Sequence, residues 1–195
     1  MSDKKPVFKK GTWVGGKDGR YDYDGTVLTS DDDVRERDGY KEPMPKRDRK
    51  TGVLLFHDAK DFRPNLTPKE ILQAGSFGGT YYRPITSAVT GLKYDKIWLE
   101  LPQNWLQGLD VPTMISSPVY DKKVNHYKTK CGASLKEWES KGWIKECDPY
   151  GWFMWYTRFY LGRRNEDDDR QVLSQTFSHC FYFFYNSRCP TGVLT

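Results

Sequence analysis

Hydrophobic positions are spread unevenly along the chain, and their pattern predicts where the folded part begins. Residues 1–50 mix charged residues with glycine and show no sustained period of 2 or 3.6. Such a pattern is typical of a disordered or loosely attached arm. Residues 53–56 then form a short apolar run, which predicts a strand. We therefore expect a disordered, charged arm over residues 1–50 and a folded domain over residues 51–172.

A helix signal follows the predicted strand. Thr67 is a suitable N-cap, Pro68 suits the first helical position, and Glu70 can complete a capping box. Gly75 is placed to end this helix. The spacing predicts a short helix just before a glycine-rich loop.

The next part of the chain has a less regular pattern. Residues 94–120 contain three prolines, two tryptophans and short apolar runs, which predict irregular packing with at most one strand or short helix. A second capping box, Ser134 with Glu137, predicts another helix, and Gly142 is its expected end.

The segment from residue 148 to residue 164 is rich in aromatic side chains. Asp148 is a good N-cap, Pro149 a good first residue and Gly162 a good terminator, so we predict a helix over residues 149–161. Four of its rings recur at the spacing of one helix face, namely Trp152, Trp155, Tyr156 and Phe159. We interpret this face as core rather than as a platform for a ligand.

These elements together predict the fold class. A chain of 195 residues has room for one ordinary domain with tails. Charged residues make up 29% and mean hydropathy is −0.80, whereas aromatic residues reach 15%. We expect an α+β fold: a small, helix-rich single domain with few short strands and a disordered N-terminal arm.

Charge is concentrated in the part expected to fold. Residues 63–164 hold 15 Lys/Arg and 9 Asp/Glu, a net charge of +6, whereas the whole chain carries +5. A basic folded region favours anionic partners, above all nucleic acid. The other interpretation is a soluble surface with surplus lysine.

Basic and aromatic residues alternate between residues 120 and 130, as they do in many nucleic-acid-binding surfaces. This segment, YDKKVNHYKTK, carries four lysines beside two tyrosines. Lysines hold phosphates and aromatic rings stack on bases, although an exposed loop with ordinary lysines has the same composition. The predicted phosphate ligands are Arg83, Lys122, Lys123, Lys128, Lys130, Arg158, Arg163 and Arg164, with Tyr120 and Tyr127 as stacking residues.

Two further functions remain open from the sequence. Residues 75–79 include three glycines, which indicate a tight turn or, with Arg83 after them, a backbone loop that a phosphate can approach. The acidic run at residues 166–169 resembles a Mg²⁺ site, or else the solvated start of a helix. An enzyme acting on a phosphorylated or nucleic-acid substrate is therefore one alternative, and a protein-interaction module without catalysis is another.

No cofactor or metal site is predicted, and no membrane segment is visible. The four cysteines form no CxxC pair, and His126, Cys131 and Cys147 lack the spacing of structural zinc. Neither a signal peptide nor an apolar run of membrane-spanning length is present. We expect an intracellular protein, nuclear or cytoplasmic, and the basic run at residues 46–50 is either a nuclear-import patch or a solvated linker. The oligomeric state is left open.

Three segments carry a resemblance to known proteins. They are FRPNLTPKEILQAGSFGGTYYRPI, KCGASLKEWESKGWI and DPYGWFMWYTRFYLGRRNEDDDRQ. Together, over residues 62–171, they resemble an uncharacterised family of fungal, algal and protist proteins. That resemblance implies no activity, because none is established for the family.

The chain departs from this family after residue 171. Family members continue with further helical sequence, whereas residues 173–195 here form an atypical tail that includes FYFFY. Five adjacent aromatic residues make an aggregation-prone window in a soluble protein. Our hypothesis is that the tail is translated intron, and the alternative is a terminal strand buried against the domain.

Overall fold

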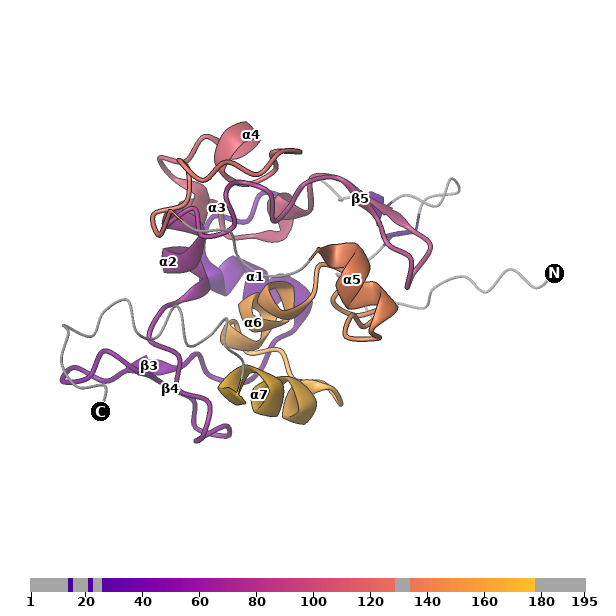
Figure 1. Cartoon of the computed structure of the whole chain (residues 1–195). Coiled ribbons are helices and arrows are strands. Elements are labelled where there is room, and N and C mark those ends of the chain that lie inside the picture. The colour runs from indigo at the N-terminus through magenta and orange to yellow at the C-terminus, as the bar shows by residue number, and fades with distance from the viewer. Residues whose placement is uncertain (1–13, 16–20, 23–25, 129–133, 178–195) are drawn as a thin grey trace, which may run out of the picture.

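Helix α6 lies at the centre of the molecule. The computed structural model describes residues 14–15, 21–22, 26–128 and 134–177. Figure 1 shows α6 (Trp152–Tyr160) in the middle, with helices on several sides of it. Every residue from Phe153 to Phe159 is buried, so the helix is enclosed all round rather than along one stripe.

Helices hold most of the regular secondary structure of the described residues, and the strands are short. The fold is α+β, as predicted. The helical elements are α1 (Asp31–Asp38), α2 (Pro68–Gln73), the 3-10 helix η1 (Ile97–Glu100), α3 (Gln103–Leu106), α4 (Val111–Met114), α5 (Leu135–Ser140), α6 and α7 (Asp168–Phe177). The strands form three antiparallel pairs, β1 (Val14–Gly15) with β2 (Tyr21–Asp22), β3 (Lys46–Arg47) with β4 (Leu54–Leu55), and β5 (Ile85–Thr86) with β6 (Lys93–Tyr94).

Aromatic rings from distant segments fill the core around α6. Phe62 packs its ring 5.5 Å from that of Trp155 and 5.9 Å from that of Phe159, centroid to centroid. On another side of the helix, Phe153 lies 4.8 Å from Phe77 and 4.9 Å from Tyr81. Each such buried ring contributes about 1.5–3 kcal/mol through the area that it removes from water. The predicted core role of the α6 rings is confirmed.

The start of α6 differs from the prediction. The helix begins at Trp152, because Gly151 before it has φ +87° and ψ −154°, which is not a helical conformation. Asp148 does not cap the helix, since its carboxylate accepts hydrogen bonds from arginine side chains instead. The predicted N-cap role of Asp148 and the predicted start at residue 149 were wrong.

Residues 26–50 belong to the folded unit, contrary to the predicted boundary at residue 51. Ser30 and Asp33 form a capping box for α1, and Leu28 and Val34 are buried in the core. Trp105 Nε1 also donates a hydrogen bond to Asp31 Oδ1 at 2.6 Å. The hydrophobic pattern missed α1 because Val34 is its one buried residue. Of the predicted arm, residues 1–13, 16–20 and 23–25 lie outside the described residues, as do residues 178–195 of the tail.

The cap signals placed two other helices correctly. Thr67 and Glu70 form the predicted capping box of α2, with Pro68 at its start. Ser134 accepts a hydrogen bond from the Glu137 N–H at the start of α5. None of the described helices is long and apolar enough to cross a membrane.

Prolines mark short helices in the region that was expected to be irregular. Pro102 stands at the N-cap of α3, and Pro112 stands in the first turn of α4. Proline suits these positions because its missing N–H would have no helical partner there. The expectation of at most one strand or short helix over residues 94–120 was therefore wrong, since η1, α3 and α4 all fall within it.

The glycine-rich turn, residues 75–80, is covered by another part of the chain. Gly75, Gly78 and Gly79 all have positive φ. A Cβ at Gly79 would overlap the carbonyl oxygen of Thr113, and one at Gly78 would overlap the ring of Tyr120. The glycines are thus needed for close contact with residues 113–124. The loop is a structural turn and not an open cradle for a phosphate.

This packing predicts unequal effects of two glycine substitutions. We expect Gly79→Ala to lower the free energy of unfolding by about 2–4 kcal/mol, because the new Cβ meets backbone. Gly91 has a similar φ of +71° with open space around it, so Gly91→Ala should cost only about 1–2 kcal/mol. Chemical denaturation of both variants checks this. Equal losses would contradict the proposed backbone contact.

Candidate functional site

The predicted basic segment forms a loop braced against the glycine turn. We call residues 120–128 the lysine loop. Its backbone donates a hydrogen bond to the turn, from Asp121 N to Gly78 O at 3.0 Å, and another to the residue just before the turn, from His126 N to Ala74 O at 2.8 Å. The buried Asn125 side chain also donates to Ser76 O, at 3.0 Å. The loop is therefore held along its length by the turn beneath it.

Three of the predicted lysines project from this loop into solvent. Lys122, Lys123 and Lys128 are exposed, and none of them forms an ion pair with another described residue. Lys128 has φ +55°, and its Nζ donates to Lys123 O at 3.4 Å. The structure thus brings these cations together on one anchored loop. Lys130 lies outside the described residues.

The two predicted stacking tyrosines help to build the loop. The Tyr120 ring lies against Gly78, and its hydroxyl accepts a hydrogen bond from Asn125 Nδ2 at 2.9 Å. Tyr127 is half-buried against the core and meets the His126 ring edge-on at 5.2 Å. Both rings are partly exposed, so they combine a bracing role with some accessible surface.

Arg83 follows the glycine turn directly. Its Nη1 donates to Thr80 O at 3.0 Å, and its own carbonyl accepts a hydrogen bond from the Tyr150 hydroxyl at 2.8 Å. The side chain is half-buried, and no described carboxylate forms an ion pair with it. Arg83 therefore stays a predicted phosphate ligand.

Arg158 and Arg163 lie in the interior, where they share the carboxylate of Asp148. Arg163 donates two hydrogen bonds to Asp148, Nη1 to Oδ1 at 2.8 Å and Nη2 to Oδ2 at 2.5 Å. Arg158 donates to Asp148 Oδ1 at 3.0 Å and to Glu100 Oε2 at 2.9 Å. Their side chains are only 8% and 13% exposed. These two predicted phosphate ligands lie inside the fold, where the carboxylates of Asp148 and Glu100 neutralise their charges.

Electrostatics in this interior cluster favour the ionised forms. Burial alone would raise the pKa of Asp148, but the guanidinium groups of Arg163 and Arg158 outweigh burial and hold the pKa below its ordinary value. Next to it, burial and the charge of Asp148 raise the pKa of Cys147 to about 11. The Cys147 thiol is therefore protonated at neutral pH, which disfavours a nucleophilic role.

Arg164 differs from the other two arginines because it is nearer the surface. Its Nε donates to Asp58 Oδ2 at 2.7 Å and its Nη2 to Oδ1 at 3.1 Å, which gives a two-pronged ion pair. The guanidinium also lies over the Phe159 ring, 3.8 Å from its centroid. Arg164 thus has a carboxylate partner already and is a weaker candidate for a phosphate.

The acidic run at residues 166–169 leads into α7, and the carboxylates of Asp167 and Asp168 accept hydrogen bonds from neighbouring residues. Trp155 Nε1 donates to Asp168 Oδ1 at 2.9 Å, and Asn165 N donates to Asp168 Oδ2 at 2.8 Å. Asp167 accepts from Arg170. Of the two sequence interpretations, the start of a helix is what the structure shows.

Beside Arg158, a cavity lined by Tyr40 and Tyr82 among others has room for about one water molecule.

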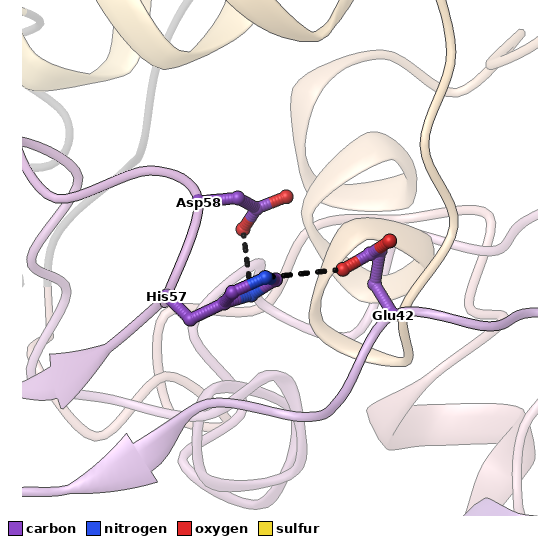
Figure 2. A group of neighbouring side chains, drawn as sticks. All are labelled: Glu42, His57 and Asp58. Carbon is purple, nitrogen blue, oxygen red and sulfur yellow. Dashed lines mark ion pairs between the residues drawn. The ribbon is translucent and has the colours of Figure 1, made fainter.

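A cluster that the sequence did not predict lies near the open end of the β3–β4 hairpin. Figure 2 shows His57 between the carboxylates of Glu42 and Asp58. His57 Nε2 lies 3.5 Å from Glu42 Oε2, and His57 Nδ1 lies 3.5 Å from Asp58 Oδ1. Only the adjacent His-Asp pair is visible in the sequence. Glu42 precedes β3 and His57 follows β4, so the hairpin is what brings them together.

Comparisons with known proteins give no further guide to this site. No model of a known protein family, no curated protein and no solved structure matches the chain.

The interior cluster predicts a strong dependence of stability on Asp148. We expect Asp148→Ala to lower the free energy of unfolding by about 3–5 kcal/mol, because it leaves two buried guanidinium groups with one carboxylate. The control Asp58→Ala breaks a more exposed pair and should cost about 0–1 kcal/mol. Denaturant unfolding of each variant at pH 7 measures these two losses in the free energy of unfolding. Similar losses would refute the buried role.

The same carboxylate predicts how that difference changes with pH. Because the folded-state pKa of Asp148 is lowered, its contribution is complete above about pH 4 and is lost as the pH falls through the folded value. The gap in stability between the wild type and Asp148→Ala should therefore narrow below about pH 4. Unfolding curves from pH 7 to pH 3 test this, and a constant gap would contradict it.

Proposed function

We propose that this protein binds nucleic acid through phosphate contacts made by the lysine loop. The observation that carries the proposal is the arrangement of Lys122, Lys123 and Lys128, which are exposed side chains on a backbone anchored to the glycine turn. A loop held in place loses less conformational entropy on binding than a free one. Clustered lysines that form no ion pair with a carboxylate in the described part of the chain suit a row of phosphates.

The distribution of charge supports an anionic partner. Residues 63–164 contain 15 basic and 9 acidic residues. The interior cluster uses Arg158 and Arg163 with Glu100 and Asp148, and these four charges cancel. The surplus of +6 therefore belongs to the remaining side chains of this region. Such a surplus attracts polyanions and speeds their association.

The contacts proposed here are with the backbone of the nucleic acid and not with base edges. Ammonium groups bind phosphates as point charges and carry little sequence information. Tyr120 and Tyr127 are braced by the fold, so a base can reach only their exposed portions. We expect binding that depends steeply on salt and weakly on sequence.

A variant of the lysine loop tests this proposal. For the full-length chain with Lys122, Lys123 and Lys128 changed to glutamine, affinity for a labelled duplex should fall about tenfold or more at low salt. The slope of log K against log salt concentration should become shallower by about 2–3, since each lost phosphate contact removes about 0.9. Fluorescence anisotropy at several salt concentrations gives both values, and a single-stranded oligonucleotide is tested in parallel.

The matched control removes the same number of lysines elsewhere. Three exposed lysines lie on or beside the β3–β4 hairpin, namely Lys46, Lys50 and Lys60. In Figure 1 this hairpin lies at the opposite end of the molecule from α4 and the segment that follows α4. Their triple glutamine variant has the same net charge as the lysine-loop variant. Equal losses in the two variants would show general electrostatic attraction without a site, and no binding by the wild type would refute the proposal.

A further inference from the structure

Glu42, His57 and Asp58 offer the donor atoms of a transition-metal site. One donor atom from each residue lies within 4.8 Å of the other two. The set combines an imidazole nitrogen with two carboxylate oxygens, which are typical zinc ligands. Glu42 is half-buried, whereas His57 and Asp58 are exposed, so an ion in solvent has direct access.

The imidazole–carboxylate separations in this cluster are longer than direct hydrogen bonds. Both imidazole–carboxylate distances are 3.5 Å. A direct hydrogen bond between these groups would be about 2.7–3.2 Å long. Two ligands at about 2.0–2.1 Å from a tetrahedral zinc ion lie roughly 3.3 Å apart. The two carboxylates meet different ring nitrogens, whereas one ion binds a single nitrogen of an imidazole. The donor atoms that can share one ion lie within 4.8 Å of one another, so side-chain movements of about 1–2 Å bring them to zinc-binding distance.

Groups outside the cluster hold the backbone of Glu42 and the carboxylate of Asp58. Glu42 N donates to Gly162 O at 3.3 Å, and Glu42 O accepts from Arg35 Nη1 at 2.8 Å. Arg164 fixes Asp58 through its two-pronged pair and lowers the pKa of that carboxyl by hydrogen bonding. The hydrogen bonds from Arg164 orient the Asp58 carboxylate, as such bonds orient the ligands in most metal sites.

Asp58 keeps capacity for a metal despite the Arg164 pair. A carboxylate offers about four lone-pair positions, and Arg164 uses one on each oxygen. The charge is also favourable, because two carboxylates and one nearby guanidinium leave the cluster with a net negative charge before a cation binds. A site with three protein ligands leaves a fourth position of the ion for water.

We propose that Glu42, His57 and Asp58 bind one zinc ion at the surface beside the β3–β4 hairpin. This inference does not depend on the proposed nucleic-acid binding, because it involves neither the lysine loop nor the glycine turn.

Zinc titration of the full-length chain under reducing conditions tests the site. Isothermal titration calorimetry with ZnCl₂ should show one binding event that is weakened at least tenfold in His57→Ala and in Glu42→Gln. His126→Ala is the control, because His126 is also an exposed histidine but lies on the lysine loop. Circular dichroism shows whether each variant keeps its fold, and Glu42→Gln preserves the shape of the side chain if His57→Ala does not fold.

Cobalt substitution separates this site from the cysteines of the chain. Co²⁺ bound by nitrogen and oxygen should give visible d–d absorption that disappears in His57→Ala and persists in His126→Ala. Thiolate-to-cobalt charge-transfer bands, or zinc binding that is equal in the wild type and both cluster variants, would place any metal elsewhere and leave Glu42, His57 and Asp58 as an ion-pair cluster only. The absence of zinc binding by the wild type would also overturn the proposal.

Discussion

A single buried carboxylate, that of Asp148, connects the central parts of this fold. It precedes α6 in the chain and receives hydrogen bonds from Arg158 within α6 and from Arg163 after it. Arg158 extends the connection to Glu100 at the end of η1. Charges removed from water in this way need close partners, and each member of the cluster therefore restricts where its neighbours can lie. The aromatic core provides much of the driving force, whereas this cluster specifies how α6 is oriented in it.

Because these arginines pair with carboxylates of the fold, they limit which cationic side chains are accessible to an anionic partner. Two of the three arginines around α6 are neutralised inside, and Arg164 is paired with Asp58. Among the predicted phosphate ligands that the structure describes, the exposed ones are therefore Lys122, Lys123 and Lys128, which lie on one braced loop. The glycine turn contributes indirectly, since its lack of side chains allows the loop to dock. The backbone contact between the glycine turn and the lysine loop therefore positions the lysines that we propose bind phosphates.

Local signals in the sequence predicted the parts of the fold that depend on neighbouring residues. The cap of α2 at Thr67 and the core role of the α6 rings follow from spacing of a few residues. Long-range pairing was not predictable in this way. Arg158 reaches Glu100 across 58 positions, and the hairpin between Glu42 and His57 assembles a cluster with no sequence motif. The lysine loop was recognised from composition, but its anchoring required the fold.

The most direct test of this account is to map the binding surface on the full-length chain. Amide chemical-shift changes measured by NMR during titration with a short oligonucleotide at low salt would show which residues respond. Our account predicts that the changes centre on the lysine loop, residues 120–128, and the adjoining glycine turn, while the amides of Arg158 and Arg163 respond little. Changes centred on residues 158–164 would contradict it, because they would mean that the interior arginines open to meet the phosphates.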